Sequence, residues 1–452
     1  MNGLPEIPAG WRWSTVQDVG RLDLGRQRHP DWHNGPEMRP YLRVANVFED
    51  RIDTSDVKEM DFSGGVFDRY KLNVGDVLLN EGQSPEFLGR PAIYRGIPEN
   101  VAFTNTLLRF RAGPDVTPEW ALIVFRRHMH ARRFIRESRI TTNIAHLSSS
   151  RLKTVEFPVP PLAEQRQIAE FLEDHLSRLD AADAGLRHST RRLLAFHHAF
   201  LRTVLLGVDV PGLRECRLLP EAGVNDGTLP PLPVGWQWLR LGDVADVVGG
   251  VTKDSKRQSD PAFVEVPYLR VANVQRGHLN LDNVATIRVA PAKADALRLQ
   301  PGDVLLNEGG DRDKLARGWV WEGQIDGCIH QNHVFRARVR EGLIDPRLLS
   351  WAANTLGAPW AENNGKQTTN LASISLSKIR LMPIPVPLRD VQPGLVQQIS
   401  DQLAGIDRLA KQVKSGLDRS QALRKSLLDA AFSGRLTGLA SDVDMVEELA
   451  GV

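Results

Sequence analysis

Residues 162–207 read LAEQRQIAEFLEDHLSRLDAADAGLRHSTRRLLAFHHAFLRTVLLG, and this stretch decides the fold. Its apolar residues recur every seven positions, as Leu172, Leu179 and Leu186 do. This spacing is typical of the seam of a coiled coil. A helix with one apolar seam on a charged surface needs a partner, because the seam would otherwise face water. The stretch therefore predicts a long helix packed against a second one.

The same seam recurs near the end of the sequence. An offset of 227 residues carries the first ladder onto Ile399, Ile406 and Val413. The obvious partner of the first helix is therefore the second, and the return path of the chain makes the pair antiparallel. Some 44 residues of helix span roughly 66 Å, so the pair would hold the parts of the chain at its two ends well apart.

The rest of the sequence is also duplicated. PYLRVANV at 40–47 returns unchanged at 267–274, and GDVLLNEG at 75–82 returns unchanged at 302–309. Long matching runs at one offset indicate a tandem duplication, and the repeat is too long for a solenoid. Short β-branched runs such as YLRVANV predict strands, whereas Pro118–Ser138 and its counterpart Pro346–Glu362 are expected to be helical.

These patterns predict an α+β fold with pseudo-twofold internal duplication. Two tandem globular α/β domains are separated by two long helices packed as an antiparallel coiled coil. The expected parts are a first domain at 1–161, a helix at 162–207, a linker at 208–232, a second domain at 233–388, a helix at 389–434 and a tail at 435–452.

Composition excludes several classes of protein. A hydrophobic content of 42% allows substantial cores, and a net charge of +2 does not by itself indicate a nucleic-acid partner. No apolar run approaches the roughly 18 residues of a membrane span, and the first residues do not resemble a signal peptide. The two cysteines are too few for a disulfide framework. We expect a cytoplasmic protein without a membrane partner.

The sequence contains no recognisable catalytic motif. A phosphate-binding glycine loop, a dinucleotide fingerprint, the Pro-Pro-aromatic loop of adenine methyltransferases and an H-E-x-x-H zinc site are all missing. Glu81 and Glu308 follow equivalent strands, but a nuclease site would need a second acid and a lysine in both halves. We interpret them as turn residues, and expect no catalytic residue and no metal in this chain.

A basic run indicates nucleic acid. Between Val124 and Lys153 the sequence has eight Lys and Arg residues and one acid, Glu137. On a helix these side chains would share faces suited to phosphates, although a solvated helix face is the ordinary explanation of such a run. The run leads into a TTN segment that both halves contain. The candidate residues are Arg126, Arg127, Arg132, Arg133, Arg136, Thr141 and Asn143, with Lys366, Thr368 and Asn370 in the second half.

A second candidate is the loop ahead of each PYLRVANV. The two loops differ in sequence on similar frames, as two readers of different DNA sequences would require. An ordinary variable surface loop is the alternative. The candidate residues are Arg26, Arg28, His29, His33 and Asn34 in the first half and Lys253, Lys256 and Arg257 in the second.

Several motifs in this order resemble the DNA specificity subunits of Type I restriction-modification enzymes. PPLAEQRQI at 160–168 and AFSG at 431–434 are specific to that family. The repeated GW-x-W, YLRVANV, GDVLLNEG and TTN segments extend the resemblance over nearly the whole chain. The first helix departs from the family, since it ends in AFLRTVLLG and not in AFSG.

The resemblance implies that 1–161 and 233–388 are target recognition domains reading a two-part, asymmetric target in double-stranded DNA. It implies that the two helices are a spacer that docks two methyltransferase subunits. Those partners use S-adenosylmethionine, and restriction subunits use ATP and Mg, so this chain needs no cofactor and is not itself an enzyme. A standalone DNA-binding scaffold and a nuclease with an unfamiliar site remain as alternatives.

Overall fold

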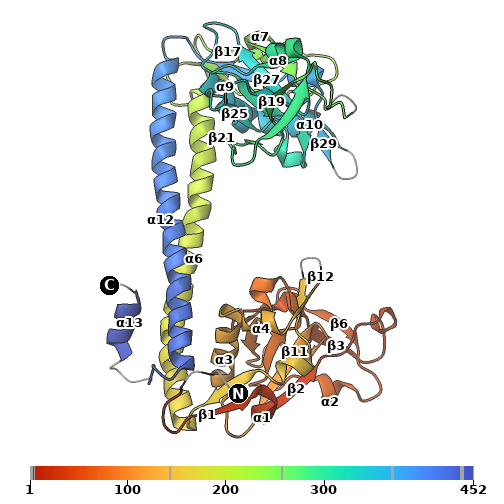
Figure 1. The fold of residues 1–452 in the computed structure, drawn as a ribbon, viewed down its shortest axis with the longest axis vertical. Coiled ribbons are helices and arrows are strands. Elements are labelled where there is room, and N and C mark those ends of the chain that lie inside the picture. The colour runs from red at the N-terminus through yellow and green to blue at the C-terminus, as the bar shows by residue number, and fades with distance from the viewer. Residues whose placement is uncertain are drawn as a thin grey trace. The chain divides into compact units, whose positions relative to one another are not determined.

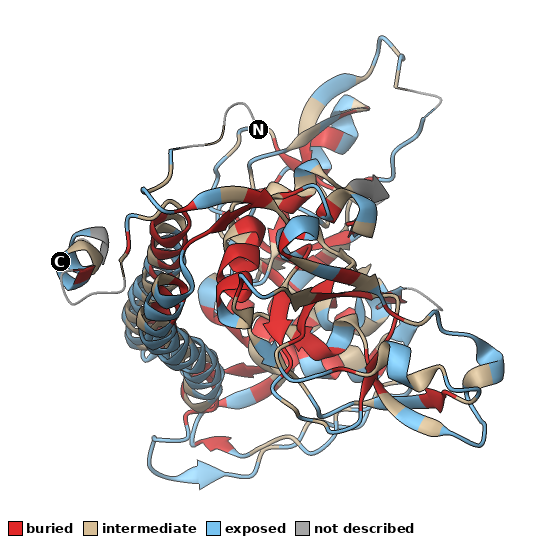
Figure 2. Cartoon of the chain, turned by 90° about the horizontal axis from the view of Figure 1, so that it is seen from below, coloured by how far each residue is buried: buried red, intermediate tan, exposed pale blue. Residues whose placement is uncertain are grey.

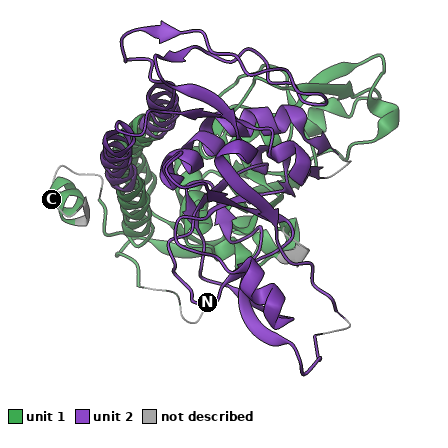
Figure 3. Ribbon diagram, turned by 90° about the horizontal axis from the view of Figure 1, so that it is seen from above, with its two compact units in different colours: residues 1–188, 413–452 green, residues 189–412 purple. Residues whose placement is uncertain are grey.

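The protein was analysed as a computed structural model that describes Leu4 and residues 6–141, 144–255, 258–367, 371–437 and 442–450. The chain forms two compact units (Figure 3). Unit 1 comprises residues 1–188 and 413–452, and unit 2 comprises residues 189–412. Each unit thus includes a globular part together with the adjoining ends of both long helices. The compact units therefore divide the chain differently from the six parts expected from the sequence.

Two long helices connect the units along the chain (Figure 1). Helix α6 runs from Leu162 to Leu206, and helix α12 from Gln392 to Phe432. Both long helices were predicted, with limits at 162–207 and 389–434, and both are confirmed. The first turns of the two helices are attached to the globular parts in the same way. Gln165 donates to the carbonyl of Pro160 at 2.9 Å, and Gln392 donates to that of Pro387 at 3.0 Å.

In unit 1 the two helices pack antiparallel. A Cβ atom at Gly416 would lie 3.1 Å from Cδ1 of Leu186, and Arg424 donates to Asp180 at 2.6 Å. Residue numbers of the contacting positions therefore rise along α12 while they fall along α6, so the two helices run antiparallel. Leu172 belongs to the core of unit 1. The seam of the helices and the interior of the globular part form one apolar cluster.

Unit 2 repeats this arrangement at the other ends of the helices. Leu201 and Leu205 of α6 and Ile399 of α12 belong to the same buried cluster as Leu349 of the globular part. Figure 2 shows buried residues concentrated in the globular parts and many exposed residues along the long helices. The helices are thus buried mainly along their seams and at their ends, as a single apolar stripe requires.

Besides a two-stranded hairpin of β4 Val47–Phe48 and β5 Arg51–Ile52, the described residues of the globular part of unit 1 form four small sheets. The largest has the order β2-β11-β7-β9, and the others are β10-β3-β6, β12-β13-β8 and β1-β14. Their strands are β1 Arg12–Thr15, β2 Gly20–Leu24, β3 Met38–Leu42, β6 Lys58–Asp61, β7 Val77–Asn80, β8 Gly82–Gln83, β9 Pro91–Ile93, β10 Ala102–Phe103, β11 Leu107–Ala112, β12 Arg139–Thr141, β13 Ile144–His146 and β14 Glu156–Val159.

Unit 2 has the same four sheets in the same strand order. They are β18-β27-β23-β25, β22-β19-β26, β24-β29-β28 and β17-β30. Their strands are β17 Gln237–Arg240, β18 Ala245–Gly249, β19 Val264–Leu269, β22 Ala285–Val289, β23 Val304–Asn307, β24 Gly309–Gly310, β25 Gly318–Val320, β26 Ile329–His330, β27 Val334–Val339, β28 Lys366–Gln367, β29 Ala372–Ser373 and β30 Pro383–Val386. The duplication read from the sequence is thus a duplication of the fold.

The YLRVANV segment is only partly a strand, contrary to our expectation. Strand β3 ends at Leu42, and Val44–Asn46 form a 3-10 turn. The side chain of Asn46 accepts from the backbone N–H of Arg43 at 3.1 Å and donates to the carbonyl of Asp53 at 3.0 Å. These local bonds replace those of a sheet ladder. Asn273 makes the equivalent bonds in unit 2.

The helix expected at 118–138 is interrupted. Helix α3 covers Pro118–His130 and α4 covers Arg133–Arg136. Arg132 lies between them with a φ of 54°, a left-handed conformation that ends the first helix. The counterpart expected at 346–362 is continuous, since α9 Pro346–Ala352 and α10 Ala358–Asn364 are joined by a π-helical turn.

Membrane insertion has no candidate helix in the part of the chain that the structure describes. No helix there is both long and apolar enough to cross a bilayer.

The shared core of unit 1 makes a prediction about stability. Leu172→Ala should lower the free energy of unfolding by about 2–5 kcal/mol, because it leaves a cavity where helix and globular part meet. Leu194→Ala on the same helix is the matched control, since Leu194 is 57% exposed and should change stability by less than about 0.5 kcal/mol. Urea denaturation of both variants measures the difference, and equal effects would contradict a common core.

Candidate nucleic-acid interface

Four segments of unit 1 meet beside the end of strand β7. Arg26, which follows β2, forms an isolated parallel bridge with Thr104. The backbone N–H of Glu81, directly after β7, donates to the carbonyl of Thr106 at 3.0 Å. The carbonyl of Glu81 accepts from Leu147, directly after β13, at 2.8 Å. The structure thus places the Arg26 loop, the 104–106 turn, the NEG turn and the end of strand β13 side by side.

Unit 2 brings the equivalent four segments together with the same bonds. Val251 forms a parallel bridge with Gln331, and Glu308 donates to the carbonyl of His333 at 3.0 Å. The carbonyl of Glu308 accepts from Ile374 at 2.9 Å. In each unit, described residues next to both candidate segments therefore lie close together. Two equivalent backbone frames carry two surfaces, which we call interface 1 and interface 2.

The predicted residues of the first loop are mostly accessible. Arg28, His29, His33 and Asn34 are exposed. Arg26 is partly buried, donates to the carbonyl of Asp61 and lies with its guanidinium 4.0 Å from the centre of the Trp32 ring. Arg26 therefore stabilises the loop, and the four exposed residues are the ones that can reach a ligand.

Three arginines of the basic run have partners inside unit 1. Arg126 is 5% exposed and bonds to Glu49 at 2.8 Å. Arg127 bonds to Asp429 of α12 at 2.9 Å, and Arg133 bonds to Glu156 at 2.9 Å. A phosphate contact would require these pairs to break, at a cost of several kcal/mol for a buried pair. The interpretation of Arg126, Arg127 and Arg133 as a phosphate-binding face is therefore wrong in this structure.

Arg132 and Arg136 are exposed members of that run, as is Lys153 at its end. Because Arg132 lies in the break between α3 and α4, the run does not form the continuous helix face that we expected. Arg136 ends α4, three residues before the hairpin strand β12. These two side chains remain candidates for phosphate contacts at the edge of interface 1.

Several other predicted residues cannot be placed. Asn143, Lys256, Arg257, Thr368 and Asn370 lie outside the described residues, as does the side chain of Thr141. The backbone of Thr141 ends strand β12. Lys253 in the loop after β18 and Lys366 in β28 are both exposed. Both residues therefore stay candidates for DNA contacts.

The structure contains two carboxylate–imidazole pairs that the sequence did not predict. Glu81 lies 3.4 Å from Nδ1 of His146, and Glu308 lies 2.7 Å from Nδ1 of His333. The glutamates had been interpreted as turn residues, which their backbone bonds confirm. The pairs were missed because the two histidines occupy different positions of the repeat. Only the repeated NEG motif itself could have drawn attention to these acids.

The buried charges of unit 1 stabilise the frame beneath interface 1. Burial by itself raises the pKa of Glu49, but the hydrogen bond from His130 and the charge of Arg126 outweigh it and lower the pKa to about 2. Burial lowers the pKa of His128 to about 4, so this imidazole is neutral at pH 7. Its Nε2 bonds to the carbonyl of Glu156 at 2.9 Å. His128 and His130 are thus structural residues.

Metal ligation has no candidate among the residues with assigned positions. No group of three or more His, Cys, Asp or Glu side chains there is suitably placed. We had expected no metal in this chain, and this observation concerns only its described part.

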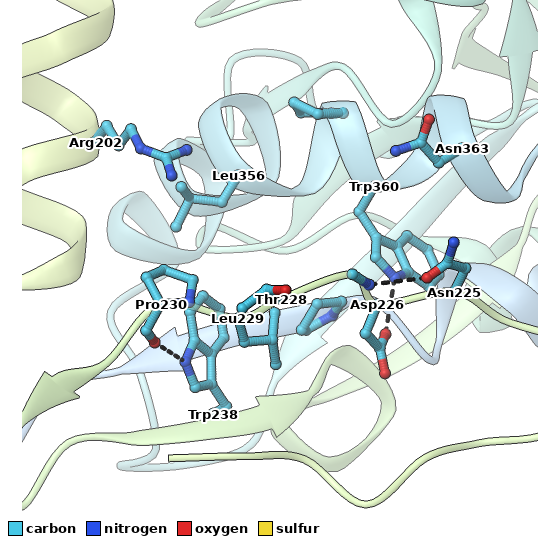
Figure 4. A pocket seen from close by; sticks show the side chains of 13 residues that line it. Arg202, Asn225, Asp226, Thr228, Leu229, Pro230, Trp238, Leu356, Trp360 and Asn363 are labelled. Atoms are coloured by element: carbon cyan, nitrogen blue, oxygen red, sulfur yellow. Dashed lines mark hydrogen bonds between the residues drawn. The ribbon is translucent and has the colours of Figure 1, made fainter. Parts of the chain in front are cut away.

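The linker of unit 2 encloses a cavity of about 240 Å³ beside α10 (Figure 4). Trp360 donates from Nε1 to Asp226 at 2.9 Å, and Trp238 donates to the carbonyl of Pro230 at 3.0 Å. Arg240 also bonds to Asp226, at 2.8 Å. Burial would raise the pKa of Asp226, but the bonds from Arg240 and Trp360 lower it. These bonds attach the linker to unit 2 as a structural joint.

Comparison with known proteins shows which proteins the chain is similar to. The family model described as "Type I restriction modification DNA specificity domain" matches residues 97–184. The chain is 22% identical over 440 residues to the StySPI specificity subunit of Salmonella potsdam, covering 96% of this chain and 90% of the relative. It is 20% identical over 437 residues to the EcoKI specificity subunit of Escherichia coli, with the same coverage.

The chain is thus similar to Type I specificity subunits over nearly all of its length. These relatives are named specificity subunits of Type I restriction enzymes, the family that the sequence motifs resemble. A solved structure entitled "Structural basis underlying complex assembly and conformational transition of the type I R-M system" shares the fold. It has a TM-score of 0.64 at 18% identity, and the match covers 96% of this chain and all of that one.

The exposed Arg132 and Arg136 provide a test of interface 1. Arg132→Glu combined with Arg136→Glu should weaken binding to all DNA sequences and reduce the slope of log affinity against log salt by roughly 2, because two phosphate contacts are lost. A fluorescence-anisotropy titration over several salt concentrations measures both quantities.

Arg12→Glu is the matched control, because Arg12 is half exposed on β1 and its pair with Asp115 is a surface pair of small energy. It should leave the salt slope nearly unchanged. Equal slopes for the wild type and the double variant would show that Arg132 and Arg136 do not contact the phosphates of DNA.

Proposed function

We propose that this chain is a specificity subunit that recognises a two-part, asymmetric sequence in double-stranded DNA, with one part read by each unit. The proposal rests on the two interfaces, which share one backbone frame and differ in their side chains. Interface 1 presents Arg28 and His29 where interface 2 presents Lys253, and Thr106 of interface 1 corresponds to His333. Different donors and acceptors on similar frames are suited to reading different base pairs in the major groove.

We also propose that two methyltransferase subunits dock on this chain and that restriction subunits join them. Exposed apolar side chains on the helix pair of unit 2 support a docking role. Leu194 is 57% exposed, Phe196 is 48% exposed and Leu409 is 49% exposed. Such side chains on a water-facing helix are typical of a protein-binding surface. The partners would bring S-adenosylmethionine, ATP and Mg, and this chain would need no cofactor of its own.

Replacement of one globular part tests the two-part target. Residues 233–388 are exchanged for the equivalent part of a relative, and methylated adenines are mapped in DNA from cells that carry the whole system. We predict a change in one half of the methylated sequence, because the frame of unit 1 is untouched.

The reciprocal exchange of residues 1–161 is the matched control and should change the other half. A change in both halves after a single exchange would contradict independent reading. A purified chain that binds a single undivided sequence without methyltransferase partners would favour the standalone scaffold instead.

A second prediction concerns the spacing of the two half-sites. A heptad inserted after His188, together with a heptad before Val413, lengthens both helices where the chain passes between the units. The seam keeps its register, and each insertion adds roughly 10.5 Å, or about three base pairs. We predict that the unread gap of the methylated target lengthens by about three base pairs.

The same insertion turns one half-site about the duplex by roughly three-tenths of a turn, which would weaken binding. Three matched heptads add roughly 32 Å, close to one DNA turn, and nearly restore the phase. Insertion of four residues after His188 alone disrupts the seam and should destabilise the helix pair. If binding persists after the matched insertions and the gap does not change, the helices do not set the spacing.

A further inference from the structure

The glutamates of the two NEG turns are held in matching positions. The backbone N–H and carbonyl of Glu81 are both hydrogen-bonded to neighbouring segments of interface 1, and those of Glu308 are bonded in the same way in interface 2. The side chains are about one-quarter exposed, at 25% and 26%. Each carboxylate is therefore anchored at the meeting point of four segments and still reaches the surface.

Each carboxylate contacts an imidazole, and the two imidazoles come from different places in the repeat. His146 belongs to strand β13, where unit 2 has Ser373. His333 belongs to the turn before β27, where unit 1 has Thr106. The histidines are therefore not copies of one ancestral residue. Each unit pairs its glutamate with a histidine from a different position of the repeat. The pairing is therefore not a remnant of the duplication, which indicates that the position of the glutamate side chain matters in both units.

The contact leaves part of each carboxylate for another donor. An ionised carboxylate only accepts hydrogen bonds, so Nδ1 of His333 carries the proton that is donated to Oε2 of Glu308. The other ring nitrogen of His333, Nε2, lies 3.4 Å from Nδ2 of Asn332. Within the described residues, Oε1 of Glu308 has no hydrogen-bond partner. The imidazole thus positions one oxygen and leaves the second one for a ligand.

The chemistry of DNA restricts what that ligand is. Phosphate oxygens only accept hydrogen bonds and repel a carboxylate, so an acid on a DNA-binding surface weakens binding unless it meets a donor. The donors in the major groove are the exocyclic amino groups, N4 of cytosine and N6 of adenine. A positioned acid therefore penalises every base pair that lacks an amino group at that point.

We infer that Glu81 and Glu308 are specificity-determining residues that each accept a hydrogen bond from an exocyclic amino group in the major groove, one in each half of the target. His146 and His333 are positioning residues that orient these carboxylates. The inference rests on the proposed function, since it assigns the reading of one base pair in each half-site to one acid. It also explains why a water-facing acid occupies the same point of both interfaces.

The test uses the complete methyltransferase complex and DNA carrying its mapped target. Each adenine of one half-site is replaced in turn by purine, which lacks N6, and each cytosine by 2-pyrimidinone, which lacks N4. We expect the wild type to lose roughly 10- to 100-fold in affinity at one position read by unit 2. Glu308→Ala, whose side chain has no acceptor, should lose little further affinity at that position, whereas the other positions behave as in the wild type.

The loss of affinity for one analogue should depend on Glu308, and we call this dependence coupling. The analogue that shows it identifies the amino group as that of adenine or of cytosine. Glu308→Gln should also tighten binding to unrelated DNA several-fold, because a repulsive charge is removed. A merely structural glutamate would not produce either effect. His333→Gln should weaken the coupling at the same position without moving it, and Glu81→Ala should act in the other half-site.

Glu322→Gln is the matched control, because Glu322 is a half-exposed surface acid of unit 2 paired with Arg347. It should change neither the analogue profile nor non-specific binding. Thermal unfolding of each variant shows whether the fold is intact. If Glu308→Ala is as sensitive as the wild type to every analogue, the glutamate does not read a base and the inference is wrong.

Failure of the proposed function gives a different result. In that case the wild-type complex binds target and unrelated DNA equally, and no analogue changes its affinity. The two failures are thus distinguished by the wild-type profile alone.

Discussion

Burial of the helix seams is the constraint on which the rest of the structure depends. Each long helix has one apolar stripe, and the ends of that stripe are covered by the globular parts. Leu172 lies in the same core as Trp120 of unit 1, and Leu201 lies in the same core as Leu349 of unit 2. Apolar burial contributes roughly 25 cal/mol per Å², so separation of a helix end from its globular part would be costly. Helix end and globular part therefore form one unit.

The duplicated frame explains how one fold can present two different surfaces. Asn46 and Asn273 bond to backbone groups of their neighbouring loops, and both are almost fully buried. The NEG turns are likewise positioned by backbone hydrogen bonds. Because these bonds do not involve the exposed side chains, the surface residues can change without loss of the frame. A specificity subunit needs this separation of support and recognition.

The basic run shows where reasoning from sequence failed. Eight positive charges in thirty residues suggested a phosphate-binding face, yet Arg126 is paired with Glu49 and Arg127 with Asp429. The second partner is 302 residues away along the chain. A charge pattern shows how many cations are present locally. It does not show which acids the fold brings to them.

The sequence by itself determined the duplication, the two long helices, the repeated sheets and the family resemblance, because periodicity and matching runs are properties of spacing along the chain. Only the tertiary structure decided that Arg132 and Arg136 are exposed and that Glu81 and Glu308 each contact a histidine. Exposure and ion pairing depend on residues that are distant in sequence and adjacent in space. Local spacing therefore predicts the elements, and packing between them selects the side chains that are free to meet DNA.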